Sequence, residues 1–149
     1  GRADILDQAA PRRGGQPGYV FISGTLSGNP IGAAAGLATL AALSEPGVYE
    51  RLERAGAMLR DGFNEAAAEF DLPLEMRGEG AVSGVIVTPG ASEEAGALLP
   101  KLGRALFARG IASNLGKVYV SLAHTDDDLA ETVEAYAGAL EEVKRESLR

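Results

Sequence analysis

The sequence predicts an α+β fold, in which a small antiparallel sheet carries helices on one face. Residues 48–70 place apolar side chains such as Leu59 and Phe63 at helical spacing, which is typical of a helix that covers a core. Two short apolar runs flank Gly78-Glu79-Gly80 and indicate a β-hairpin. A second long helix is predicted over residues 126–144. Strand pairs that alternate with such helices favour this two-layer arrangement.

The composition is that of one globular domain. The chain has 149 residues, of which 46% are hydrophobic and 23% charged, so it is long enough to bury a core. Its formal net charge of −7 argues against nucleic acid or an anionic membrane as a partner. It has no cysteine, which excludes disulfides and thiolate metal sites. No leader segment is recognised, and we expect a cytoplasmic location.

In the first part of the chain, the turn-forming residues set the expected boundaries. Pro11 ends the first helix, and Pro30 suits a first helical position because its missing N–H would have no partner there. Asn29 is a good N-cap for the helix that follows. We expect a short helix over residues 3–10, a loop over 11–18, a strand or extended segment over Tyr19–Ser23, and a helix over Pro30–Ser44.

In the second part, each helix has its own start or stop signal. Ser92 is the expected N-cap of one helix and Gly110 its stop. Thr125 and Asp128 approximate a capping box at the start of the last helix. We expect a helix over Val48–Phe70, strands over Leu74–Arg77 and Val82–Val87, a helix over Ser92–Arg109, a hairpin of Ile111–Ser113 with Val118–Leu122, and a helix over Asp126–Lys144.

The turn from Gly24 to Pro30 is the strongest candidate site. It combines the hydroxyls of Thr25 and Ser27 with the start of a helix, where N–H groups and the helix dipole favour an anion such as phosphate. Simple capping by Asn29 explains the same residues without a ligand. The turn alone therefore leaves both interpretations open.

Three motifs in order resemble one family. The run Tyr19–Leu43 is similar to the phosphate-contacting segment of class III pyridoxal-phosphate aminotransferases, and within them to the aminomutase branch. The opening Gly1–Leu6 resembles the stretch that follows the family's catalytic lysine. The segment Val120–Leu129 resembles its last strand and the turn into its final helix. The resemblance covers nearly the whole chain.

The resemblance implies a fold-type I enzyme, a cofactor and a partner. Residues 1–30 would be the end of the large domain, and residues 31–149 a helical connector with the small C-terminal domain. Gly24 and Thr25 would contact the phosphate of pyridoxal 5'-phosphate in a neighbouring subunit. We expect a homodimer, or pairing with the remaining N-terminal part of the same enzyme, and a small amino-acid-like substrate.

Gly116 and Lys117 are the residues expected near the substrate. Aligned on Ala123-His124-Thr125, the glutamate that the aminomutase places near its substrate falls at Gly116. This departure leaves aminomutase and ordinary aminotransferase both open. Lys117 either contacts a substrate carboxylate or is simply a lysine at a hairpin tip.

No catalytic residue and no metal site are expected in this chain. In the family, the lysine that holds the cofactor and the aspartate beside its ring nitrogen come before the segment that Gly1–Leu6 resembles. We therefore expect the C-terminal part of a longer enzyme, inactive alone. His124 is the only histidine, and Asp126–Asp128 suits the dipole of a helix start. Two alternatives remain: a non-catalytic dimerisation or binding module, and an independent phosphate-binding domain.

Overall fold

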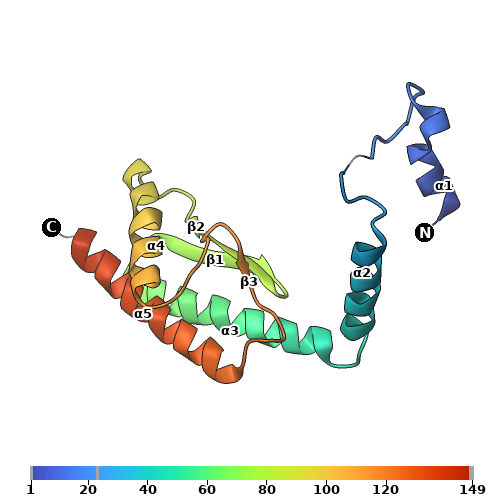
Figure 1. The fold of residues 1–149 in the computed structure, drawn as a ribbon. Helices are drawn as coiled ribbons and strands as arrows, with labels where there is room; N and C mark the ends of the chain where they lie inside the picture. The colour runs from blue at the N-terminus through green and yellow to red at the C-terminus, as the bar shows by residue number, and fades with distance from the viewer. Residues whose placement is uncertain (1, 23, 148–149) are drawn as a thin grey trace. The chain divides into compact units, whose positions relative to one another are not determined.

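The structure is a computed structural model that describes residues 2–22 and 24–147. It divides into two compact units, Gly1–Ser44 and Glu45–Arg149 (Figure 1). The predicted boundary at residue 30 belongs to the parent enzyme and stays a prediction.

The first unit is mainly helical. It contains α1 (Ala3–Leu6), the 3-10 turns η1 (Asp7–Ala9) and η2 (Pro11–Arg13), and α2 (Pro30–Leu43). The short first helix and the start of α2 are thus as predicted. Of the two alternatives expected over Tyr19–Ser23, the strand is wrong for residues 19–22, which leaves the extended segment; Ser23 lies outside the described residues. Val20 donates its N–H to the Gln8 carbonyl, but no neighbouring strand is available to form a ladder.

The helix α2 is apolar all round. None of its fourteen residues is charged and none is buried; Ile31 is 79% exposed and Leu37 70%. A helix without a polar face normally lies inside a larger protein. Among the described residues of its own unit, nothing gives α2 such a covering.

The second unit is the predicted α+β sandwich. Its helices are α3 (Val48–Glu69), α4 (Leu98–Ala108) and α5 (Asp126–Ser147), and its strands are β1 (Leu74–Glu79), β2 (Val82–Val87) and β3 (Val118–Tyr119). The strands form an antiparallel sheet in the order β1-β2-β3. The sheet lies over α3, with α4 and α5 beside it (Figure 1), so the predicted fold class is confirmed.

The core lies between the sheet and the helices. Leu74 and Met76 of β1 and Val85 of β2 point to the helical side, while Arg77 and Val82 remain exposed on the other. The rings of Phe63 on α3 and Tyr136 on α5 meet edge to face, with centroids 5.4 Å apart. The remaining fully buried large side chains are Leu102, Leu106, Leu140 and Val143.

The hairpin is held close to α3 by a glycine contact. A Cβ at Gly56 would collide with the carbonyl oxygen of Gly80, so only glycine fits at that crossing. Arg60, one turn further, donates to the same carbonyl at 2.9 Å and pairs with Glu53 at 2.9 Å. The segment Gly78–Gly80 is therefore a hairpin turn, as predicted, and Gly56 lets it lie close to α3.

Two predicted elements are only partly correct. Residues 92–109 begin with a 3-10 segment, η3 (Glu93–Ala97), and Ser92 forms no side-chain cap. Pro100 explains this start, because its ring crowds the carbonyl four residues earlier and disfavours a regular α-helix there. Residues 111–113 form a loop. The segment that contains β3 is expected from the sequence to pair with them, but β3 pairs with β2.

The last helix starts as predicted. Thr125 Oγ1 accepts the Asp128 N–H at 3.1 Å, while an Asp128 carboxylate oxygen accepts the Thr125 N–H at 2.7 Å. This reciprocal pair is a capping box.

In the described part of the chain no single helix is long and apolar enough to cross a membrane. Only α2 and α3 taken as a bent pair meet that test by length and composition.

Candidate functional site

The Gly24–Pro30 turn is exposed and held by its own backbone. Ser27 donates its N–H to the Gly24 carbonyl at 2.9 Å, and Asn29 donates to the Leu26 carbonyl at 3.1 Å. Gly28 has φ +78°, a left-handed conformation that favours glycine. A Cβ at Gly24 would lie 2.8 Å from the Ser27 hydroxyl, so Gly24 keeps the turn tight.

The start of α2 is not an open anion site. Asn29 Oδ1 accepts the Ile31 N–H at 2.8 Å and the Gly32 N–H at 3.3 Å, and the Asn29 carbonyl accepts the next one, from Ala33. Pro30 has no N–H. The expectation of unoccupied N–H groups at this helix start is therefore wrong, because the N-cap side chain occupies two of them.

Thr25 keeps its donors available. Among the described residues, neither its N–H nor its hydroxyl has a hydrogen-bond partner, and the side chain is exposed. No acidic side chain lies between Gly24 and Pro30. Arg12 and Arg13 both pair with Asp7, the latter at 3.8 Å. Within the turn, then, Thr25 is the residue best suited to donate to an anionic group.

Gly116 and Lys117 lie at the end of a short loop in the second unit. Asn114 organises it: its side chain accepts the Gly116 N–H at 3.1 Å, and its carbonyl accepts the Lys117 N–H at 2.8 Å. A Cβ at Gly84 would lie 2.7 Å from the Gly116 carbonyl, so the loop rests directly on β2. Both residues are exposed. Lys117 lines a cavity, whereas Gly116 is not part of its lining.

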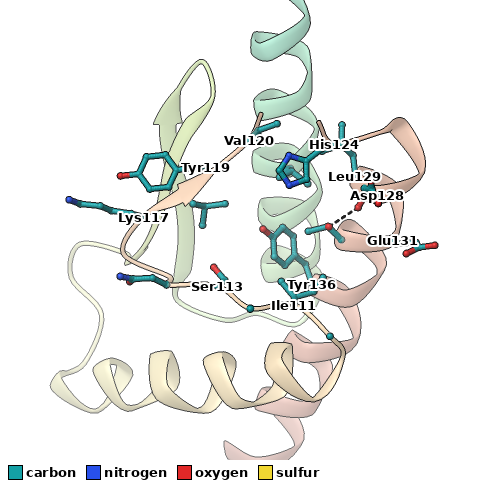
Figure 2. Close-up of a pocket in the computed structure, with 16 residues that line it drawn as sticks. Ile111, Ser113, Lys117, Tyr119, Val120, His124, Asp128, Leu129, Glu131 and Tyr136 are labelled. Carbon is teal, nitrogen blue, oxygen red and sulfur yellow. Dashed lines mark hydrogen bonds between the residues drawn. The ribbon is translucent and has the colours of Figure 1, made fainter. Parts of the chain in front are cut away.

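That cavity has a volume of about 670 Å³ and lies between β3 and α5 (Figure 2). Leu59 of α3 forms part of its floor, and the loop Gly110–Asn114 closes one end. Lys117 lies on the β3 side, and Glu131 on the α5 side. The cavity therefore has a lining of both polar and apolar groups, with opposite charges on two sides of its rim.

His124 and Asp128 border the cavity in structural roles. His124 Nδ1 accepts the Ser121 N–H at 3.1 Å just before the helix cap. The bonds that Asp128 accepts from the Thr125 N–H and hydroxyl, with a smaller effect of His124, lower the pKa of its carboxyl below the ordinary value. Among the described residues, no cluster of histidine and acidic side chains could hold a metal ion.

Two hydroxyls in the cavity were missed by the sequence analysis. Ser113 Oγ is buried without a hydrogen-bond partner among the described residues, and Tyr136 is 1% exposed. Burial raises the pKa of Tyr136 to about 12. In the sequence Tyr136 is one more apolar-face position of a helix and Ser113 one more loop serine, so neither carried a signal.

Comparison with known proteins gives a consistent picture. The family described as aminotransferase class-III matches residues 1–140. A glutamate-1-semialdehyde 2,1-aminomutase of Roseiflexus castenholzii is 39% identical over 97% of this chain, and one of Thermus thermophilus is 38% identical over 94%. In both cases the chain covers 34% of the relative. It therefore spans about a third of the length of the curated relatives it matches.

Solved structures agree with the fold. A structure described as a transaminase with PLP bound superposes over the whole chain with a TM-score of 0.79 at 26% identity, covering 35% of that protein. An omega-transaminase from Sphaerobacter thermophilus gives 0.77 at 25% identity, over 96% of this chain and 34% of the other. A β-phenylalanine aminotransferase from Variovorax paradoxus gives 0.71 at 28% identity, over 95% and 34%.

Proposed function

The chain belongs to the class III aminotransferase family, and from that premise we propose that it supplies one part of a pyridoxal-phosphate site in a longer aminotransferase or aminomutase. The support is the family match over most of the chain, together with solved relatives that include a transaminase with PLP bound. The full enzyme would transfer an amino group on a small amino-acid-like substrate.

The observation that carries this proposal is the state of Thr25. Its hydroxyl and N–H are exposed and have no partner among the described residues, and Gly24 keeps the turn tight. A phosphate offers anionic oxygens that accept such donors strongly. Gly24 and Thr25 would thus hold the cofactor's phosphate, and the bound cofactor would supply the electron-withdrawing ring on which amino-group transfer depends.

The phosphate contact is proposed to act across a dimer interface. The helix that begins five residues after Thr25 is apolar all round and has no buried residue, so it needs a cover that the described residues of its own unit do not supply. A partner subunit would provide that cover and at the same time receive Thr25. Light scattering of the complete protein should give twice the mass of one chain; a monomer would contradict this part.

Thr25→Ala tests the phosphate role. The change removes one charge-assisted hydrogen bond, worth about 1.5–3 kcal/mol, so the dissociation constant for pyridoxal 5'-phosphate should rise roughly 10- to 100-fold in the complete protein. Retained cofactor is measured by its absorbance after dialysis.

Thr39→Ala is the matched control for that experiment. Thr39 lies in α2 and donates its hydroxyl to the Ala35 carbonyl at 2.9 Å, so its loss leaves the turn untouched. Equal cofactor retention by the wild type and Thr25→Ala would refute the assignment.

Lys117 is proposed as the substrate-side residue of the second unit. It is exposed on the cavity rim, and its backbone is fixed by Asn114. A lysine there is suited to a substrate carboxylate. The role of Lys117 is the same in an aminomutase and in an ordinary aminotransferase, because Gly116 has no side chain that would favour either reaction.

A further inference from the structure

The two edges of the sheet are treated differently. At the β1 edge, the Asn64 side chain of α3 replaces a missing strand: it donates to the Met76 carbonyl at 3.1 Å and accepts the Met76 N–H at 2.7 Å. Both outward-facing groups of that residue are therefore satisfied. This is one of the ways in which proteins close a sheet edge.

The β3 edge is open. Val120 donates its N–H to the Ala81 carbonyl at 2.9 Å, toward β2. Because backbone groups alternate along a strand, the N–H and carbonyl of Tyr119 face the opposite side. β3 is the last strand of the sheet, and in the described part of the chain no strand follows it. Tyr119 therefore presents an unused donor and acceptor.

The cavity lies along this open edge. Val118–Val120 form one wall, and α5 forms the other with residues that include Leu129 and Tyr136 (Figure 2). Leu59 adds to an apolar floor. A volume of about 670 Å³ holds several residues of extended chain, and the neighbouring-strand position lies about 4.8 Å from β3.

The buried, unpartnered hydroxyl of Ser113 borders the same space. Buried polar groups in native proteins nearly always have hydrogen-bond partners. Here the Ser113 hydroxyl lacks one among the described residues. An occupant with hydrogen-bonding groups of its own would satisfy it.

We propose that an extended segment of the same protein, from outside these 149 residues, lies in this groove and pairs with Tyr119 of β3 as a fourth strand. The inference rests on the proposed function, in which the chain is one part of a longer enzyme. Relatives about three times as long provide ample chain for this role. A polypeptide fits because the groove offers backbone pairing on one wall and an apolar floor.

The geometry also sets the character of the segment. Side chains alternate along a strand, so every second residue faces Leu59 and Leu129 and should be apolar. Lys117 and Glu131 lie on opposite sides of the rim, so outward-facing residues there should be polar. A carbonyl of the segment would accept from the Tyr136 hydroxyl.

Hydrogen exchange in the complete protein tests the pairing directly. The Tyr119 amide should exchange roughly 100-fold slower than in an unstructured peptide, because the added strand occupies it. Val120, bonded to Ala81, is the internal reference for a protected amide. Exchange of Tyr119 at the free-peptide rate beside a protected Val120 would overturn the proposal.

Crosslinking identifies the occupant. A photoreactive benzoylphenylalanine replaces Glu131, which is exposed on the α5 side of the rim. It should capture a peptide outside residues 1–149 of the same protein. Tyr119→Pro removes the edge N–H and should lower the yield several-fold, whereas Tyr119→Ala keeps that N–H and should not. Capture of a second copy of residues 1–149, or equal yields in both variants, would overturn the proposal.

Failure of this proposal and failure of the proposed function are separable. Protection of Tyr119 that appears only after an amino acid is added would make the groove a small-molecule site and overturn the strand. Cofactor retention in the Thr25→Ala experiment reports on the phosphate role alone. A protected Tyr119 in a protein that binds no pyridoxal 5'-phosphate would retain the strand and refute the cofactor role.

Discussion

Helices α2 and α3 are both regular and rich in small residues, yet their surroundings differ. α3 has an apolar stripe that the sheet and α5 cover, and it buries Gly56, Leu59, Phe63, Ala66 and Ala67. α2 has no polar face and buries nothing. An amphipathic helix can be completed by its own domain, whereas a uniformly apolar one needs cover on all sides. The second unit thus has its own core, whereas the described residues of the first unit leave α2 uncovered.

The largest effect is expected at Phe63, the centre of the α3 contact. Phe63→Ala should cost about 3–5 kcal/mol of unfolding free energy, because it removes a fully buried ring and leaves a cavity beside Tyr136. Urea unfolding of the 149-residue chain measures this. Phe107→Ala is the matched control: its side chain is 74% exposed, and its loss should change stability by less than about 0.5 kcal/mol. Similar losses in both variants would contradict the assigned core.

Glycine-to-alanine changes should alter stability less than Phe63→Ala, and in opposite directions in α3 and α2. Gly56→Ala should cost about 1–3 kcal/mol, since the new Cβ meets the Gly80 carbonyl and the hairpin must move. Gly36→Ala meets no atom within 4 Å among the described residues, and in the 149-residue chain alanine should favour α2 by up to about 1 kcal/mol.

In the complete protein, we expect Gly36→Ala to lower stability, the opposite of its effect in the 149-residue chain. If Gly32 and Gly36 serve close packing there, as their spacing predicts, Gly36→Ala will lower the melting temperature of the complete protein. Stabilisation of both the 149-residue chain and the complete protein would contradict a packed α2.

The smallest expected effect is the pH dependence of helix capping, which should differ between the starts of α2 and α5. α2 is capped by the neutral Asn29, whereas α5 is capped through the carboxylate of Asp128. The pKa of Asp128 is lowered when folded, so its contribution is present above the unfolded value near 3.8 and is lost as pH falls through the folded value.

Nuclear magnetic resonance titration checks this difference. The Thr125 amide shift should follow the Asp128 carboxyl, with a midpoint below pH 3.8, while the Ile31 amide bonded to Asn29 should show no such step. Asp128→Asn should abolish the step at Thr125. A midpoint at or above 3.8 would refute the capping role of the charge.

Local signals predicted most of the elements. Asn29 with Pro30 marks the start of α2 and Thr125 with Asp128 that of α5, because capping is decided by neighbouring residues. The failures lie where pairing is non-local. Residues 19–22 have strand composition but pair with no strand among the described residues. Residues 111–113 form a loop, and β3 pairs with β2, some thirty-five residues earlier in the chain.

The candidate sites divide in the same manner. The sequence by itself determined the family, the fold class and the Gly24–Thr25 turn, since these depend on residue order and local geometry. Only the tertiary structure showed that Ser113 and Tyr136 share one cavity, and that β3 leaves an open edge where Asn64 closes the other. Such features depend on which distant segments meet, and hydrogen-bond satisfaction is decided only after they have met.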